Sequence, residues 1–250
     1  MQIRASLGQF KRERGLERYW GEPLAAFVRA EDGRFLSLKK QVSPTHLLPE
    51  DLLPGARGVI CFFIPFHKRI IGGNTQGTAA SREWAEAYLY TNELIARISG
   101  DLAGLLAEGG FKSALIPATH NFDEERLISD WSHRHVAHIA GLGSFGINNM
   151  LITERGCCGR FGSLVTGWAP GPSVSAGPEG AAEYCLHRRK GSCGLCQKKC
   201  PAGAYADGVF NRRICYDRCL ENARIHHATG FADVCGKCLC GLPCSSSVPP

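Results

Sequence analysis

Residues 193–201 read CGLCQKKCP, so that cysteines stand at positions 193, 196 and 200 and a proline follows the last of them. The spacing C-x2-C-x3-C-P is most of the run with which bacterial ferredoxins hold [4Fe-4S] clusters. In that run the cysteine before the proline ligates the second of two clusters. A further group, Cys235, Cys238 and Cys244, follows near the end of the chain. The two groups together predict an electron-transfer protein with two [4Fe-4S] clusters.

Cysteine is concentrated in the last quarter of the sequence. The chain has 250 residues and 13 cysteines. Ten of them lie in this quarter: Cys185, Cys193, Cys196, Cys200, Cys215, Cys219, Cys235, Cys238, Cys240 and Cys244. The start of the chain, MQIRASLGQFKRERGLERYW, is charged and lacks the apolar stretch of a secretory signal, so we expect a cytoplasmic protein. In a reducing compartment, cysteines at this density indicate metal or redox chemistry rather than disulfides.

The composition is that of a soluble globular protein, with 44% hydrophobic and 21% charged residues. No apolar run approaches the roughly 20 residues that a transmembrane helix needs, so no membrane association is expected. The length allows one sizeable core, or one domain with a small appendage.

The spacing also suggests how eight cysteines divide between two clusters. Each cluster needs four thiolates, and the first motif cannot supply them alone because Lys190 stands where a further cysteine would complete it. Cys185 is the nearest substitute. The predicted ligands of one cluster are Cys185, Cys193, Cys196 and Cys244. The predicted ligands of the other are Cys200, Cys215, Cys235 and Cys238.

Some of these assignments have alternatives. Cys219 lies four residues after Cys215 and is its rival as a ligand. Cys240 follows Cys238 too closely to join the same cube. Cys157 and Cys158 lie outside the cysteine-rich region, and we interpret them as spare small residues, although a redox role is conceivable. A structural zinc site is the alternative for the whole set, because C-x2-C pairs also bind zinc.

Basic residues are dense around the cysteines: Arg188, Arg189, Lys190, Lys198, Lys199, Arg212 and Arg213. The formal net charge is +6, and two clusters with eight thiolates would lower it to about +2. The basic residues could dock an acidic electron donor, such as a flavodoxin or a ferredoxin, or an anionic substrate. Alternatively they form a solvated surface that offsets thiolate charge.

The rest of the sequence alternates strand and helix patterns. We expect strands over 59–65 and 114–118, helices over 81–108 and 123–139, a loop over 66–80, and a hairpin that pairs 150–153 with 162–166. Residues 170–183 are rich in Pro, Gly, Ala and Ser and predict a linker. It would join an α/β (α+β) domain over 1–169, which binds a cofactor or substrate, to a ferredoxin-like domain over 184–250.

A glycine-rich run, GLGSFG over 141–146, matches the G-x-G-x-x-G pattern of dinucleotide-binding folds. That fingerprint requires a strand before the run and a helix after it. Here the expected order is the reverse, so we reject a Rossmann site.

The segment HVAHIAGLGSFGINNMLITERGCCGRFGSLVT, residues 135–166, resembles the epoxyqueuosine reductase family and, more distantly, the corrinoid reductive dehalogenases. The order of the cysteine motifs that follow is similar too, and the short members of the family are most alike. The resemblance implies an N-terminal domain that cradles a base-off corrinoid (cobalamin) and a ferredoxin-like module that feeds it electrons. The residues implied near the corrinoid are Gly141, Gly143, Ser144, Gly146 and Asn148. Alternatively, the glycines only make a tight turn.

The sequence departs from the family at three points. It lacks the family's long helical-repeat tail, which puts a tRNA substrate in doubt and leaves a small molecule or modified nucleoside. The family's Gly-Lys-Asn reads Gly146-Ile147-Asn148-Asn149, without the lysine. The proton-donating aspartate has no clean counterpart, and Asp130 or His133 is the candidate proton donor.

These observations favour an iron–sulfur reductase that relays electrons to a corrinoid or directly to a bound substrate. A ferredoxin-like carrier or reductive activator, which serves a partner protein and has no substrate of its own, is the alternative. A zinc module that binds nucleic acid is a third hypothesis, which only the basic residues favour.

Overall fold

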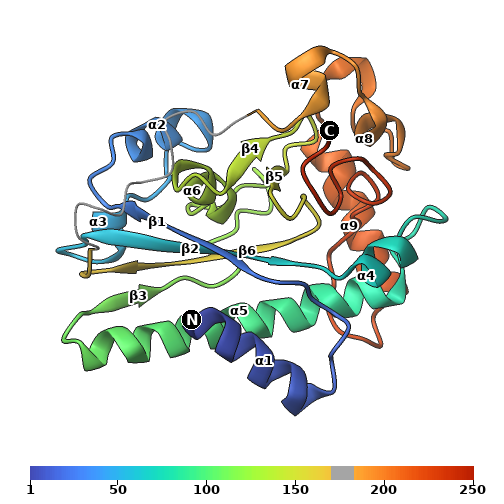
Figure 1. Cartoon of the computed structure of the whole chain (residues 1–250). Coiled ribbons are helices and arrows are strands. Elements are labelled where there is room, and N and C mark those ends of the chain that lie inside the picture. The colour runs from blue at the N-terminus through green and yellow to red at the C-terminus, as the bar shows by residue number, and fades with distance from the viewer. Residues whose placement is uncertain (170–182) are drawn as a thin grey trace.

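A computed structural model describes residues 1–169 and 183–250 of the chain. Its centre is an antiparallel sheet of four strands in the order β1-β2-β6-β3 (Figure 1). The strands are β1 (Leu24–Arg29), β2 (Gly58–Pro65), β6 (Gly159–Thr166) and β3 (Ser113–Leu115). The two long central strands pair over their whole length, from Gly58 opposite Thr166 to Pro65 opposite Gly159. The fold is therefore mixed α/β with antiparallel sheets, as the first part of the fold prediction stated.

Helices cover both faces of the central sheet, which explains why β2 is apolar at nearly every position. On one face, Phe62 and Ile64 pack with Leu94 and Ile98 of α5 (Arg82–Glu108), beside α1 (Gln2–Arg14). On the other face, Val59, Cys61 and Phe63 share a second core with α2 (Arg34–Gln41), α3 (Pro49–Leu52) and α6 (His133–Ile139) (Figure 1). The side chains of β2 alternate between these cores because successive residues of a strand point to opposite faces.

The C-terminal part of the chain lies at one end of the sheet, beside α4 (Lys68–Gly73) and the start of α5 (Figure 1). It contains α7 (Leu186–Lys190), α8 (Leu195–Lys198), a 3-10 turn (Ala206–Gly208) and α9 (Arg212–Ile225). A small sheet of β4 (Gly143–Phe145) and β5 (Leu151–Thr153) lies between this part and α6. No strand occurs among residues 183–250, and the ferredoxin-like character of this region stays a prediction.

The expected strand over 59–65 and the expected helix over 81–108 are confirmed. The helix begins after Ser81 because the Ser81 side chain accepts a hydrogen bond from the Trp84 backbone N–H. A strand also lies at 113–115, within the segment expected over 114–118. The expected loop over 66–80 is wrong in part, because it contains α4.

The helix expected over 123–139 is wrong in its first half. Only His133–Ile139 is helical. The Asp123 carboxylate accepts hydrogen bonds from the backbone of Glu125 and Arg126, which fixes a turn instead. Leu127 then takes a positive φ of 54°, which a right-handed helix cannot accommodate.

The expected hairpin between 150–153 and 162–166 is also wrong. β5 pairs with β4, and β6 pairs with β2 and β3. The cause is pairing with distant strands: β6 is buried along most of its length and lies in the interior of the larger sheet, where it has a partner strand on each side. The expected linker over 170–183 lies outside the described residues except for Glu183, and the domain boundaries stay a prediction.

A polar network crosses the core between β6 and α6. The Trp131 indole donates to Ser163 Oγ at 3.1 Å, and His133 Nδ1 lies 2.8 Å from the same oxygen. His133 Nε2 lies 2.8 Å from the carbonyl of Pro117, which only accepts, so Nε2 carries the proton. Nδ1 of the neutral ring then accepts from the Ser163 hydroxyl. Burial is the main cause that lowers the pKa of His133 to about 4, although the bond to Pro117 opposes it.

No helix of the described ranges, 1–169 and 183–250, is both long and apolar enough to cross a bilayer.

We predict that Gly162→Ala destabilises the protein by about 1–3 kcal/mol because the core there has no room for a methyl group. A Cβ at Gly162 would lie 2.4 Å from the Phe62 ring and 2.9 Å from Ile95. The matched control is Gly104→Ala on the exposed side of α5, where a Cβ meets nothing within 4 Å. That change is expected to stabilise by roughly 0.5–1 kcal/mol. Urea unfolding of both variants measures the change in the free energy of unfolding relative to the wild type. Equal changes for Gly162→Ala and Gly104→Ala would contradict the packing described.

We predict that His133 makes folding less stable as the pH falls from about 6.5 to 4. The unfolded chain binds a proton on this side chain below about pH 6.5, whereas the folded chain resists it until about pH 4. Stability therefore rises with pH across this window, by up to about 3 kcal/mol. Unfolding at a series of pH values should show a shallower dependence for His133→Gln than for the wild type. Parallel curves would mean that His133 is not held neutral.

Candidate functional site

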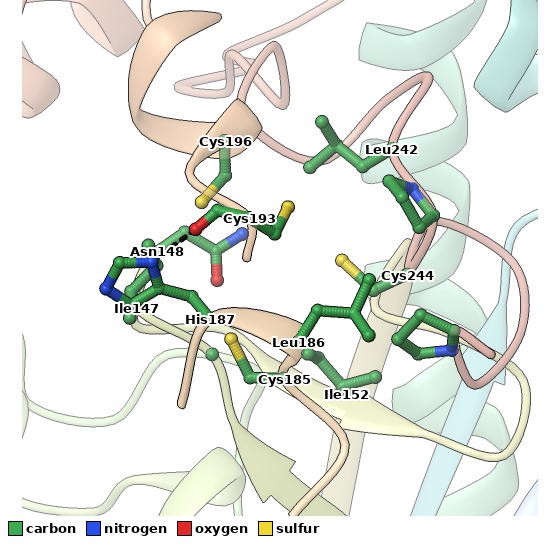
Figure 2. Close-up of a pocket in the computed structure, with 13 residues that line it drawn as sticks. Ile147, Asn148, Ile152, Cys185, Leu186, His187, Cys193, Cys196, Leu242 and Cys244 are labelled. Carbon is green, nitrogen blue, oxygen red and sulfur yellow. Dashed lines mark hydrogen bonds between the residues drawn. The ribbon is translucent and has the colours of Figure 1, made fainter. Parts of the chain in front are cut away.

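A pocket lies between the β4–β5 connection and the C-terminal segment. Four cysteines line it: Cys185, Cys193, Cys196 and Cys244. Figure 2 shows their sulfur atoms arranged around a central space. These are the four residues that the sequence assigns to one cluster. The rest of the lining is mainly apolar, with Ile147, Ile152, Leu186, Leu242, Pro243 and Pro249 among its members.

Three segments of the chain hold these cysteines in place. Cys185 is the N-cap residue of α7, and its backbone N–H donates to the Glu183 carboxylate at 2.9 Å. The backbone oxygen of Cys193 is bonded to His187 Nδ1, and Cys196 lies on α8. The carbonyl of Cys244 accepts from the Cys157 N–H at 2.9 Å. The pocket therefore depends on tertiary contacts as much as on the local motif.

The chemistry of this pocket fits an iron–sulfur cluster. All four potential ligands are thiols, the groups that hold such clusters, and the surroundings are largely apolar. Burial raises the pKa of Cys196 to about 11, and the neighbouring Cys185 and Cys193 oppose its ionisation further. Thiolates gathered here would therefore need the positive charge of bound metal.

The cysteines of the second predicted set also lie near one another in the structure. They are Cys200, Cys215, Cys235 and Cys238. Burial raises the pKa of Cys238, and the charges of Cys215, Cys235 and Cys200 contribute to the same shift. Cys235 in turn interacts with Cys215 and Cys200. Cys200 accepts a hydrogen bond from the Ala204 N–H at 3.4 Å. The four side chains are thus neighbours although up to 38 positions separate them in the sequence (238 − 200).

Cys215, the predicted ligand, and its rival Cys219 are neighbours. Both lie on α9, one turn apart, with their thiols in hydrogen-bonding contact. This contact lowers the pKa of Cys215 to about 7 and raises that of Cys219. The nearby charge of Arg134 also lowers the pKa of Cys215 and favours a thiolate at this residue.

Within residues 1–169 and 183–250, no group of three or more His, Cys, Asp or Glu side chains is arranged to hold a single metal ion. Four sulfur atoms around one zinc lie within about 4 Å of one another. The ligands of a four-iron cube surround a larger core. Both four-cysteine sets remain predictions.

Asn148 connects the two cysteine sets. It lines the first pocket, and its Nδ2 donates to the carbonyl of Cys238 at 3.1 Å. The Tyr205 hydroxyl donates to the carbonyl of Asn148 at 3.2 Å and lies 4.0 Å from the sulfur of Cys238. One residue of the predicted corrinoid-binding loop is therefore part of the boundary between the two sets.

The other residues of the glycine loop have structural contacts. Gly141 follows α6 with φ 82°, and a Cβ at Gly143 would lie 2.0 Å from the carbonyl oxygen of Ile152. Ser144 Oγ accepts from the Tyr184 N–H at 2.8 Å. A Cβ at Gly146 would approach Asn148 Oδ1 to 2.8 Å. These contacts favour the tight-turn alternative for the glycines, and their corrinoid contacts stay a prediction.

The two candidate proton donors have different surroundings. Asp130 is 18% exposed and its carboxylate bonds His120 Nδ1 at 2.5 Å and Asn121 Nδ2 at 2.8 Å. His133 has both nitrogens bonded within the core. Its environment is that of a buried structural histidine, and its catalytic role stays a prediction. Sequence analysis missed His120, because a single histidine in a loop carries no pattern.

Sequence analysis also missed two arginines, one of which, Arg134, lies near the second set. Arg134 donates to the carbonyl of Asn149 at 2.6 Å and interacts electrostatically with Cys215. The Arg160 guanidinium lies 4.2 Å above the ring of Tyr88, whose hydroxyl donates to Asp233 at 2.6 Å. Arg134 thus places positive charge beside Cys215, where a thiolate is expected, whereas Arg160 interacts with Tyr88 and Asp233.

Comparison with known proteins supports the fold. No protein-family profile and no curated sequence matches the chain. Epoxyqueuosine reductase from Bacillus subtilis, with its catalytic loop swung out of the active site, aligns over 100% of this chain and 67% of that chain, with a TM-score of 0.53 and 17% identity. The enzyme from Streptococcus thermophilus covers 100% and 68%, with a TM-score of 0.51 and 16% identity.

A reductive dehalogenase, whose structure suggests a mechanism for B12-dependent dehalogenation, aligns with a TM-score of 0.59 and 16% identity. The alignment covers 90% of this chain but only 30% of the dehalogenase. The chain thus has the fold of the epoxyqueuosine reductases and, more distantly, of the corrinoid reductive dehalogenases, which confirms at the level of the fold the resemblance seen in its sequence.

Proposed function

We propose that the chain is an iron–sulfur reductase that holds two [4Fe-4S] clusters and relays single electrons to a corrinoid or directly to a bound substrate. The observation that carries the proposal is the pocket lined by Cys185, Cys193, Cys196 and Cys244. The spacing of the sequence selects these four residues, and folding brings them together from three separate segments. Cysteines without a shared function would not be expected both to match a ligand spacing and to line one pocket.

Different residues would bind the two clusters, fix their separation and compensate their charge. The first set holds one cluster in the apolar pocket, and Cys200, Cys215, Cys235 and Cys238 hold the other. Asn148 contacts both sites and keeps their separation fixed. Arg134 lies near Cys215 and offsets the negative charge that the second cluster gains on reduction.

Asp130 is the residue that we assign to proton delivery. Its carboxylate and His120 form a partly exposed pair that can hold one proton between them and pass it to an acceptor nearby. The neutral, fully bonded ring of His133 orders the core behind this pair rather than reacting itself.

The proposal that the chain binds a corrinoid is based on its fold alone, since a dehalogenase of similar fold performs B12-dependent chemistry. A bound corrinoid would supply a strongly reducing, nucleophilic cobalt centre. The substrate would be a small molecule or a modified nucleoside. The chain covers 67–68% of the length of these two epoxyqueuosine reductases.

The electron donor would dock at α7. This helix begins directly after Cys185, and its exposed residues include Arg188, Arg189 and Lys190. A flavodoxin or ferredoxin with an acidic surface would be attracted to this site, close to the first cluster. The same observation favours the alternative function, an electron carrier or activator for a partner protein.

We predict that the protein, reconstituted anaerobically with iron and sulfide, binds about eight irons per chain. Cys196→Ser and Cys238→Ser should each lose about four, because each removes a ligand of a different cluster. Cys61→Ala, a change within β2 and outside both sets, is the matched control and should keep them all. Iron analysis with visible and EPR spectra provides the measurement. A colourless zinc protein, or full iron content in both serine variants, would refute the assignment.

We predict that the iron-loaded protein binds cobalamin in its base-off form. Size-exclusion chromatography of protein mixed with hydroxocobalamin should show co-elution and a shift of the corrinoid visible bands, with cobalamin alone as the control. Absence of binding would leave the clusters in place but favour the carrier over the corrinoid-dependent reductase.

A further inference from the structure

Four thiols, three of them buried, meet where the turn before β6 packs against the C-terminal segment. They are Cys157, Cys158, Cys240 and Cys244. The first three are completely buried, with 0% exposure. Only Cys244 belongs to a predicted cluster, so three thiols of this group have no assigned role.

The backbone fixes the two segments against each other. The Cys157 N–H donates to the carbonyl of Cys244 at 2.9 Å, and the Cys158 N–H donates to that of Ser245 at 3.1 Å. Gly156 has φ 78°, and a Cβ there would lie 2.4 Å from the backbone nitrogen of Ser246. Only glycine permits this approach, so the meeting of the thiols is built into the backbone.

The thiols form a continuous series that starts at the pocket. Cys244 lines the pocket, and Cys157 contacts both Cys244 and Cys158. Cys158 contacts Cys240 at the far end.

This last pair is held by neutral polar groups. The Cys158 thiol donates to the carbonyl of Leu239 at 3.2 Å, and Asn74 Nδ2 donates to the Cys240 sulfur at 3.6 Å. Asn74 is itself fully buried and is fixed by its bond to the carbonyl of Cys235 at 3.0 Å.

We propose that Cys158 and Cys240 form a reversible disulfide that stores two electrons beside the first cluster, an inference that rests on the proposed function. The other pairings are less favourable. Neighbours such as Cys157 and Cys158 form only strained disulfides, and Cys244 is assigned to the cluster.

The electron balance is as follows. Two reduced clusters give one electron each, the S–S bond breaks, and two protons from water complete the two thiols. Oxidation reverses each step. Each cluster carries a single electron, so the disulfide doubles the capacity of the chain from two electrons to four. Because both sulfurs are buried, thiols in solution cannot reach them, and electrons enter through the clusters.

The test is an anaerobic electron titration of the iron-loaded full chain. The wild type should take up about four electrons per chain, one for each cluster and two for the disulfide. Cys158→Ser and Cys240→Ser should each take up about two while keeping the wild-type iron content. Cys61→Ala is the control and should take up four. Equal uptake by the wild type and both serine variants would overturn the proposal.

Peptide mapping after alkylation of the oxidised wild type provides a second readout that needs no variant. A linked peptide pair containing Cys158 and Cys240 is expected, and it should disappear when the clusters are reduced first. A link between Cys157 and Cys244, or no link at all, would overturn the proposal. If the chain bound no iron, the proposed function would fail, and the mapping alone would still decide whether the two cysteines pair.

Discussion

The contact between the C-terminal segment and the end of the sheet is the constraint on which the candidate site depends. The buried ammonium of Lys237 donates to the carbonyls of Asn74 and Gln76, at 3.1 and 2.6 Å. Gly236 lies so close to Trp84 that a Cβ would be 2.2 Å from its ring. If the C-terminal segment moved away from these two carbonyls, the ammonium of Lys237 would be left buried without hydrogen-bond acceptors, which is unfavourable. The segment therefore stays in this position. The same segment carries Cys235 and Cys238 of the second set and Cys244, which lines the first pocket.

The same contact explains why cysteines distant in sequence converge. The cysteines that line the first pocket come from the segments of α7 and α8 and from the C-terminal loop. Residues of the β4–β5 connection line the pocket as well. The turn before β6 then supplies two further thiols behind Cys244. The central sheet acts as the rigid base, since its longest strands pair along their whole length and both faces are covered. A site of many thiols needs such a base, because the side chains repel one another when ionised.

Local patterns predicted much of this architecture. The apolar run at 59–65 indicates a buried strand, and the three- and four-residue spacing up to Glu108 indicates α5, because both signals act within one segment. The C-x2-C spacing selected Cys193 and Cys196, because this part of the ligand run is local too. Cys185 and Cys244, which line the same pocket, lie outside that run.

The features that could not be predicted from the sequence are contacts between residues that lie far apart in the chain. The pairing of β6 with β2 is decided by a strand about 100 positions away. Arg134, Arg160 and His120 acquire meaning only from the groups that folding places around them. Cys157 and Cys158 were interpreted as spare small residues because nothing local connects them to Cys240.

The central claim is that two sets of four cysteines surround two iron cubes. Anomalous scattering at the iron edge, measured on crystals of anaerobically prepared protein, tests it most directly. The account predicts two compact groups of iron, one among Cys185, Cys193, Cys196 and Cys244 and the other among Cys200, Cys215, Cys235 and Cys238. A single ion at either position, or an iron group ligated by Cys157 or Cys240 in place of these residues, would contradict it.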